Sequence, residues 1–198
     1  MDKHTPEPAE ADEGTQISLE IARLSNAFPF GVEGSSERVM DLLLNYLPVQ
    51  YRAWSLCETY QEHASWACRL LERDEIIDDI LTPIYKYMKE KDGTDPESPR
   101  SISYHKLAVL FMVFAVGASV DLTLEPCERR FLLHNLNVFM LSGNTESKTF
   151  YQLSRACLSM RSVFDSPEIA TVQAVALMGV YYGLSGTSST MDGSVSHL

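Results

Sequence analysis

Three large aromatic side chains are the residues whose types and spacing come closest to a binding chemistry. Trp54, Tyr60 and Trp66 fall in one helical stretch between residues 50 and 66. Aromatic rings can line a pocket for a small-molecule effector, but large rings in a helix also bury much apolar area, which is typical of core residues. The sequence therefore predicts core positions for these residues and leaves an effector pocket as the alternative.

Four cysteines could in principle supply thiolates to a metal ion or form disulfides. They are Cys57, Cys68, Cys127 and Cys157. None of them has the short paired spacing that brings thiolates to one zinc ion. Free cysteine in a helical pattern usually behaves as a small buried hydrophobe, and we expect this of Cys57 and Cys68. The sequence therefore predicts neither a zinc site nor disulfides.

A run of carboxylates between residues 74 and 79 could suggest a cation site. The acidic residues alternate with large apolar residues at helical spacing, which is typical of a helix with one solvated and one buried face. We assign to the solvated face Asp74, Glu75, Asp78 and Asp79, and to the buried face Ile76, Ile77, Ile80 and Leu81. Pro83 removes an interior hydrogen bond, so we expect it to break or kink this helix.

The sequence carries no motif of a familiar catalytic mechanism. It has no glycine-rich phosphate loop, no nucleophile elbow and no histidine pair at metal-ligand spacing. His63 and His105 lie in predicted helices, where we expect packed or capping residues rather than catalysts. We therefore expect that the chain is not an enzyme, and we assign no catalytic, cofactor-binding or metal-ligating residue. An enzyme with a pocket around Trp54 and Trp66 stays the last alternative.

The charge balance argues against direct binding of nucleic acid. The 198 residues carry a formal net charge of -11, whereas neutralisation of phosphates needs a basic patch. Arg129 and Arg130 form the nearest approach to one. Acidic residues are concentrated near the N-terminus, in a composition that cannot drive collapse. We expect residues 1–26 to form an acidic disordered tail.

Length and hydropathy indicate one globular core without a membrane span. The chain is 45% hydrophobic and 22% charged, which is ordinary for a globular domain. The most apolar run, residues 107–120, is too short to cross a bilayer, which takes about 20 residues. The N-terminus has acidic residues where a signal peptide needs basic ones. We therefore expect neither membrane insertion nor secretion.

Apolar spacing and capping signals predict an all-α, multi-helix fold. Before residue 125, helical patterns cover residues 36–47, 50–66, 74–81 and 105–120, and a polar loop covers residues 89–100. Ser166 and Pro167 are good start signals for a last helix. Its residues 169–184 are almost all apolar or small, so it has no evident wet face. We expect Gly179 and Gly183 to let another helix come close.

Several blocks of sequence carry a likeness to one known family. They are residues 41–48 (Asp-Leu-Leu-Leu-Asn-Tyr-Leu-Pro), the tryptophan-bounded stretch 53–66, residues 81–83 (Leu-Thr-Pro), residues 120–124 (Val-Asp-Leu-Thr-Leu), residues 161–168 (Arg-Ser-Val-Phe-Asp-Ser-Pro-Glu) and residues 171–174 (Thr-Val-Gln-Ala). Over residues 36–126 and 144–192 the chain resembles the regulatory domain, or middle homology region, of fungal zinc-cluster transcription factors.

The resemblance implies that residues 27–198 form a partial regulatory domain of all-α fold. It implies a nuclear protein, otherwise a cytoplasmic one, that regulates DNA-templated transcription through protein partners or a small-molecule effector. In this family zinc and DNA are bound by a separate six-cysteine module, so we expect no cofactor in this chain and no specific DNA binding by it. The alternative is a stand-alone helical interaction protein that acts as a dominant-negative fragment.

The chain departs from the family pattern in two places. Residues 127–143 form an atypical insertion, whose apolar residues would be exposed or would overfill a core packed without them. We interpret this insertion as a translated intron or an isoform. After residue 192 the family continues into a further long helix, so we expect a domain that is incomplete at its C-terminus. Loss of that helix would expose the apolar surface of the helix over residues 169–184.

Overall fold

The computed structural model describes residues 17–32, 37–67, 69–91, 102–121, 145–160, 163 and 167–186. Within these ranges every regular element is a helix, which confirms the predicted all-α class. The elements are α1 (Leu19–Ala27), α2 (Glu37–Leu44), α3 (Gln50–His63), the π-helical η1 (Glu75–Leu81), α4 (Thr82–Lys91), α5 (Tyr104–Val120), α7 (Thr145–Ser159) and α8 (Ile169–Gly186). Residues 89–91 of the predicted polar loop belong to α4, so the prediction is wrong for them, and its residues 92–100 lie outside the described residues. The segment 127–143 and the predicted cap Ser166 also lie outside the described residues.

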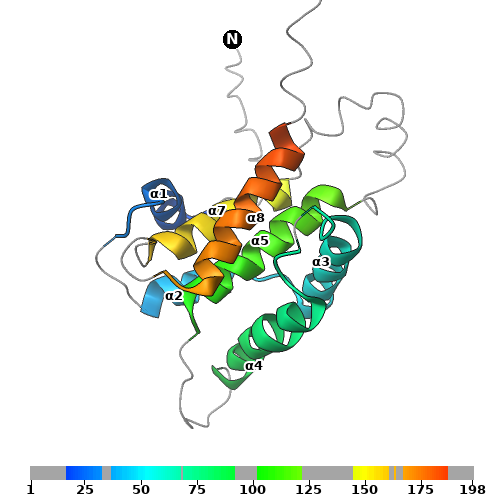
Figure 1. Ribbon diagram of the computed structural model, residues 1–198. Helices are drawn as coiled ribbons and strands as arrows, with labels where there is room; N and C mark the ends of the chain where they lie inside the picture. Colours follow the sequence, from blue (N-terminus) through cyan, green and yellow to red (C-terminus); the bar gives the residue numbers. More distant parts are fainter. Residues whose placement is uncertain are drawn as a thin grey trace, which may run out of the picture.

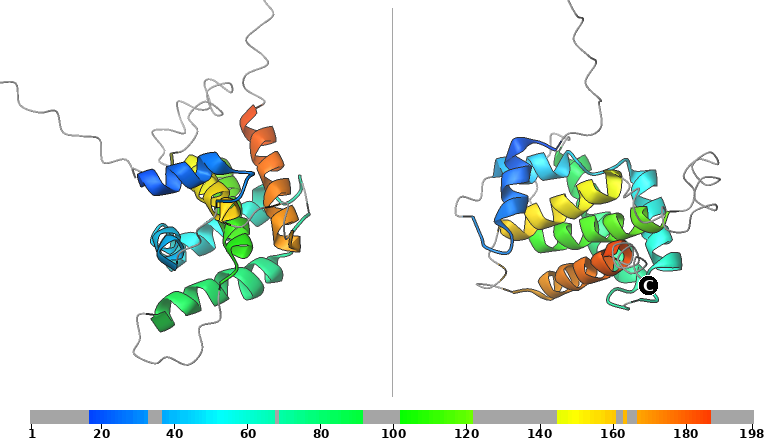
Figure 2. Two further views of the ribbon diagram at one scale, coloured as in Figure 1. Left: turned by 90° about the vertical axis from the view of Figure 1, so that its left-hand side faces the viewer. Right: turned by 90° about the horizontal axis from the view of Figure 1, so that it is seen from above.

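Helix α5 is the centre of the fold. Helices α3, α7 and α8 pack against it from different sides (Figure 1, Figure 2). Every residue from 107 to 118 is buried, as its all-round apolar sequence predicts. The ring of Phe150 in α7 stacks on Phe111 at 6.2 Å between centroids and meets Phe114 at 5.4 Å. The predicted central buried helix is therefore confirmed.

Small residues let the neighbouring helices approach α5 closely. A Cβ atom at Gly117 would collide with the carbonyl oxygen of Leu56, so the α3–α5 crossing needs glycine at this position. On the α7 side, the buried hydroxyl of Ser154 donates to the carbonyl of Ala108 at 2.9 Å. Such a bond pairs a polar group that would otherwise be costly to bury.

The structure has helix α1 within the segment 1–26, where the sequence predicts a disordered tail. The Oγ of Ser18 accepts the N–H of Ile21 at 3.4 Å and caps the helix. Ile21 and Leu24 are buried where α1 packs on α7. Two apolar residues three apart supply a buried stripe in a short helix that also carries Glu20 and Arg23. The prediction is therefore wrong for residues 19–26, while residues 1–16 lie outside the described residues.

The acidic stretch is amphipathic as predicted, but Pro83 does not break it. The predicted apolar face is buried, and η1 runs directly into α4. Pro83 lies in the first turn of α4, where a missing N–H is tolerated. The carbonyl of Asp79, four residues earlier, accepts from Nζ of Lys106 at 3.4 Å instead. The wider π-helical turn and the lysine together accommodate the proline.

Candidate functional site

The structure separates the three aromatic residues that the sequence groups together. Tyr60 is buried in the core and Trp54 is partly buried against it. Trp66 lies beyond the last turn of α3 and is 77% exposed, with its indole N–H donating to the carbonyl of His63 at 2.8 Å. The core prediction is confirmed for Tyr60 and wrong for Trp66, because the chain has left the inward helix face at that point. An effector pocket at these residues stays a prediction.

The two described cysteines are buried, and their environment favours the protonated thiol. Cys57 and Cys157 are free thiols within the core. Burial raises the pKa of Cys57 to about 12 and also raises the pKa of Cys157. A thiol that keeps its proton is a poor nucleophile and a poor metal ligand. The prediction for Cys57 is confirmed, and Cys68 and Cys127 lie outside the described residues.

Two further features concern metals and membranes. In the part of the chain that the structure describes, no group of three or more His, Cys, Asp or Glu residues is placed to hold a metal ion. In the same ranges no helix combines the length and the apolarity that crossing a bilayer requires.

His105, in the first turn of α5, is buried where α5 packs against α8. It is 1% exposed, and its Nδ1 lies 2.7 Å from Oγ1 of Thr171 in α8. The same oxygen accepts the backbone N–H of Glu168 at 2.9 Å, which satisfies a donor at the start of α8. A carboxylate oxygen of Glu168 also accepts from the hydroxyl of Ser103 at 3.1 Å. These bonds confirm the packed role that we expect for His105 and fix the N-terminal end of α8 against α5.

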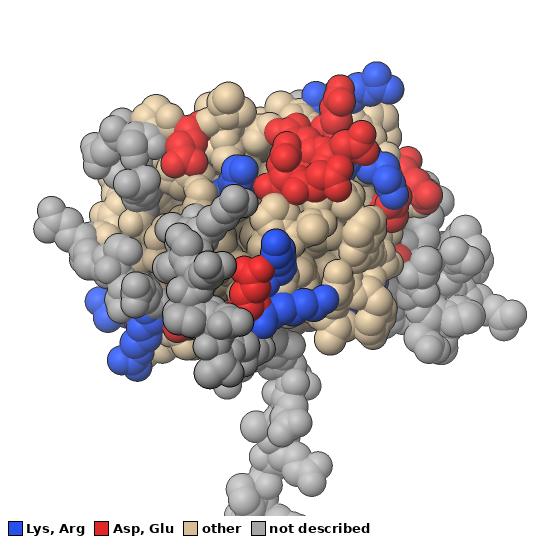
Figure 3. Space-filling model, turned by 90° about the horizontal axis from the view of Figure 1, so that it is seen from below, with Lys and Arg blue, Asp and Glu red and all other residues tan. Residues whose placement is uncertain are grey.

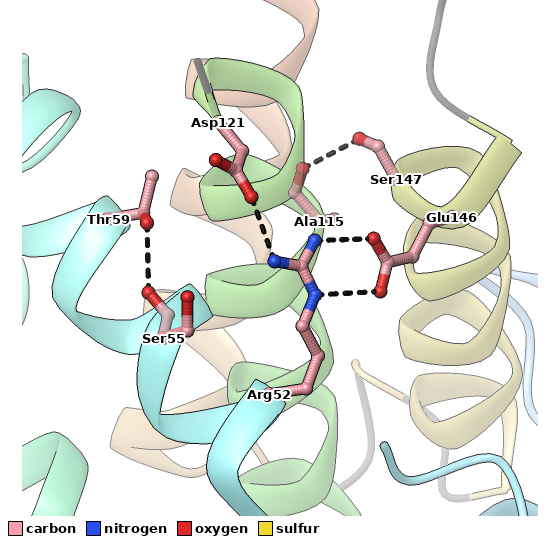
Figure 4. Close-up of polar contacts among 7 residues, drawn as sticks. All are labelled: Arg52, Ser55, Thr59, Ala115, Asp121, Glu146 and Ser147. Carbon is pink, nitrogen blue, oxygen red and sulfur yellow. Dashed lines mark hydrogen bonds and ion pairs between the residues drawn. The ribbon is translucent and has the colours of Figure 1, made fainter. Parts of the chain in front are cut away.

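A polar cluster joins three helices at the other end of α5 (Figure 4). The Nη2 and Nε atoms of Arg52 in α3 donate to the two carboxylate oxygens of Glu146 in α7 at 2.7 and 3.3 Å. Its Nη1 donates to Oδ2 of Asp121, directly after α5, at 2.8 Å. The hydrogen bond to Glu146, with a further bond to Asp121, raises the pKa of Arg52 against the opposing effect of burial. Next to this cluster, Ser147 donates to the carbonyl of Ala115 at 2.6 Å.

No sequence pattern indicates this cluster, which is structural in character. Arg52 and Glu146 are 94 residues apart in the chain, and neither belongs to a motif. The cluster holds Asp121, directly after α5, and Glu146, in the first turn of α7, on the same guanidinium group. Its charged groups are engaged with one another, so the cluster positions helices rather than a ligand.

Among the described residues, one side of α8 exposes several apolar side chains, and we call it the outer face of α8. We use this name for four apolar side chains that are exposed along one side of the helix: Ile169 (80% exposed), Val172 (63%), Val175 (41%) and Tyr182 (57%). On the opposite side, Ala170, Ala174 and Leu177 are buried, in a helix that packs on α5. Helix α8 lies at the edge of the bundle, with α5 on one side only (Figure 2). Several exposed apolar side chains on one side of a helix are typical of an interaction site.

Glycines and tyrosines shape the C-terminal half of this face. A Cβ atom built at Gly179 or Gly183 meets nothing within 4 Å, so the helix backbone is open to an incoming partner there. The expected close approach of another helix to these glycines is not made by any described residue. The hydroxyl of Tyr182 lies 2.5 Å from that of Tyr151 in α7, and the rings of Tyr151 and Tyr181 stack at 4.8 Å. These contacts fix Tyr182 in place beside the glycines.

The outer face of α8 was only partly predictable. The sequence shows a helix that is apolar all round, and this is correct. The small residues Ala170 and Ala174 were the signal for the inner face, because small side chains allow close packing on α5. No protein-family model, curated protein or solved structure matches this chain.

Proposed function

We propose that this chain is a helical regulatory module that acts through protein contacts made by the outer face of α8. The observation that carries the proposal is the exposure of Ile169, Val172 and Tyr182 on a helix without a single charged residue. Leaving such a surface in water favours nonspecific association, and a partner that covers it removes this cost. Packing within the described chain does not account for these exposed apolar side chains, whereas binding of a regulatory partner would.

The resemblance to the regulatory domain of fungal zinc-cluster factors supports regulation of transcription, in the nucleus, as the process. The net charge of -11 favours a role without direct DNA contact. In that family the six-cysteine zinc module makes the DNA contact. The raised thiol pKa values and the packed His105 favour a binding module over an enzyme. The alternative is a stand-alone interaction protein that occupies the partner surface of a full-length factor, and it would use the same face of α8.

A reporter assay tests the proposal. The chain is fused to an unrelated DNA-binding domain that carries an activation domain, and reporter output is compared with and without the chain. We expect the chain to lower output several-fold, and Val172→Asp to restore it. The matched control is Val49→Asp, because Val49 is a valine of similar exposure (60%) at the start of α3.

Two results would contradict the proposal. One is unchanged reporter output with the wild-type chain. The other is an equal effect of Val172→Asp and Val49→Asp, which would show that the response does not depend on α8. Co-expression of the free chain with a full-length zinc-cluster factor addresses the stand-alone alternative, which requires lower output from that factor without any fusion.

A further inference from the structure

We infer that the outer face of α8 binds a basic amphipathic helix of a partner protein. This inference rests on the proposed function and adds the chemistry of the partner. The outer face of α8 supplies the apolar half of the contact. An acidic segment, residues 72–79, lies beside it and supplies the charged half.

The hydrogen bonds of Gln173 place the acidic segment next to α8. Gln173 follows Val172 and lies one turn after Ile169. Its side-chain amide donates to Oε1 of Glu75 at 2.8 Å and to the carbonyl of Leu70 at 3.4 Å. Glu75, at the start of η1, therefore lies against Gln173 in the N-terminal half of α8. A partner helix that binds on Ile169 and Val172 would therefore have the acidic segment along one of its sides.

The charge of the acidic segment selects a basic partner. Residues 72–79 contain five carboxylates and one cation, Arg73, and Arg73 forms an ion pair with Glu58 of α3. One further cation, the Nζ of Lys106, lies on the backbone carbonyl of Asp79 at 3.4 Å, so the carboxylates outnumber the cations. The side chains of Glu72, Asp74, Asp78 and Asp79 are exposed. Seen from below, acidic side chains gather in one dense patch, with Lys and Arg side chains at its border and elsewhere on the same face (Figure 3). Lys or Arg on a docked helix would be attracted to these carboxylates, whereas acidic side chains would be repelled.

The shape of the surface selects a helix. Ile169, Val172 and Val175 form a ridge at helical spacing, and helices pack by placing such ridges in the grooves of a partner helix. Gly179 and Gly183 leave open space in the same face, which lets a partner backbone approach. The backbone groups of α8 are engaged within the helix, so an added β-strand finds no ladder to extend.

Area and charge argue against a second copy of this chain as the occupant. The apolar patches of single proteins typically cover about 300–600 Å², whereas a stable interface between two folded proteins buries about 800 Å² on each side. Two copies would also bring two acidic segments together, each in a chain of net charge -11. A single docked helix needs less area, and a basic one gains from the acidic flank.

Fluorescence anisotropy with the full chain tests the inference. The probe is a labelled synthetic helix of about 15 residues, roughly the length of α8, with leucines on one face and lysines on its flanks. The control probe has glutamate at each lysine position. We expect the lysine probe to bind at least about tenfold more tightly than the glutamate probe, with the preference shrinking at about 0.5 M salt.

Variants assign the binding to the predicted surface. We expect Val172→Asp to weaken binding of the lysine probe by about tenfold or more, and Val49→Asp to change it less than about twofold. The double variant Asp74→Asn, Asp78→Asn leaves the apolar ridge in place and is expected to weaken binding and to flatten its salt dependence. Equal binding of the two probes, or equal loss with Val172→Asp and Val49→Asp, would overturn the inference.

Two other occupants would also overturn it. If sedimentation shows a wild-type dimer that Val172→Asp converts to a monomer, a second copy covers the face. If the lysine probe binds only after deletion of residues 127–143, that segment of the chain covers it. The reporter assay tests the proposed function separately from the partner's chemistry. If reporter output depends on Val172 but the lysine probe does not bind, the proposed function stands and the basic helix is ruled out as the partner.

Discussion

The guanidinium of Arg52 in α3 holds the carboxylate of Asp121 at the end of α5, with Nη1 2.8 Å from Oδ2. The side chain of Asp121 is 1% exposed, whereas that of Arg52 keeps 23% of its surface in water. A buried carboxylate is costly unless a cation and hydrogen bonds compensate it. Arg52 also bonds Glu146, so one side chain sets the relative positions of α3, α5 and α7.

Replacing this arginine should therefore cost much more than replacing an exposed one. We expect Arg52→Met to lower the free energy of unfolding by about 2–3 kcal/mol, because the methionine keeps the aliphatic stem and removes the cation that faces Asp121. Arg73→Met breaks the exposed pair with Glu58, which water screens, and should cost clearly less than Arg52→Met. Urea unfolding measures both. Equal costs would mean that the Arg52 cluster is not a buried ion pair in solution.

Two glycines in helices should respond to alanine with opposite signs. Gly117→Ala places a methyl group against the carbonyl of Leu56 and should destabilise the fold by about 2 kcal/mol or more. Gly179→Ala adds its methyl group in open space and should stabilise α8 by about 0.5–1 kcal/mol through helix propensity. Thermal unfolding of the two variants compares them directly. A stabilising Gly117→Ala would contradict the close contact of α3 with α5.

The hydroxyl of Thr171 should matter for stability because it is buried where α8 packs on α5. Thr171→Val removes the oxygen that lies 2.7 Å from Nδ1 of His105 and accepts the N–H of Glu168, so we expect a loss of about 1–3 kcal/mol. The control is Thr59→Val, since the hydroxyl of Thr59 bonds only the carbonyl of Ser55 one turn earlier, near the surface. That change should stay within about 0.5 kcal/mol. Similar losses in both variants would rule out the buried bridge at His105.

The two buried thiols should react only after unfolding. In a Cys68→Ser, Cys127→Ser background, we expect a thiol reagent at pH 8 to label neither Cys57 nor Cys157 in the native chain and both in urea. Because burial raises the pKa of Cys57 from 9.0 to about 12, its neutral thiol favours the fold below pH 9, and this contribution is lost as the pH rises from 9 towards 12. Fast labelling of the native chain would show that the core opens at these residues.

The helices that sequence alone could predict are those whose pattern is local. The apolar runs of α5 and α8 and the alternation in η1 are visible in windows of a few turns. Helix α1 was not predicted because Ile21 and Leu24 alone make its buried stripe. Its stability depends on packing against α7, which is more than a hundred residues away. Tertiary packing of this kind overrides composition.

The candidate site was harder to predict than the fold, for a related reason. Residue type gave Trp66 a core position, although its place after the end of α3 leaves it exposed. The partnership of Arg52 with Glu146 depends on the packing of α3 against α5 and α7, which no spacing rule encodes. The outer face of α8 has the same apolar residue types as its inner face, so only the position of α5 tells the two apart.

The most direct test of the central claim is urea unfolding of Val172→Asp beside Ala174→Asp. Val172 is 63% exposed and Ala174 is 0% exposed, two residues apart in α8. If the outer face of α8 is a free surface kept for a partner, Val172→Asp changes the free energy of unfolding by less than about 0.5 kcal/mol. Ala174→Asp buries a charge against α5 and should cost more than about 3 kcal/mol. A comparable loss for Val172→Asp would mean that the face is packed within the chain, and it would contradict the proposed interaction surface.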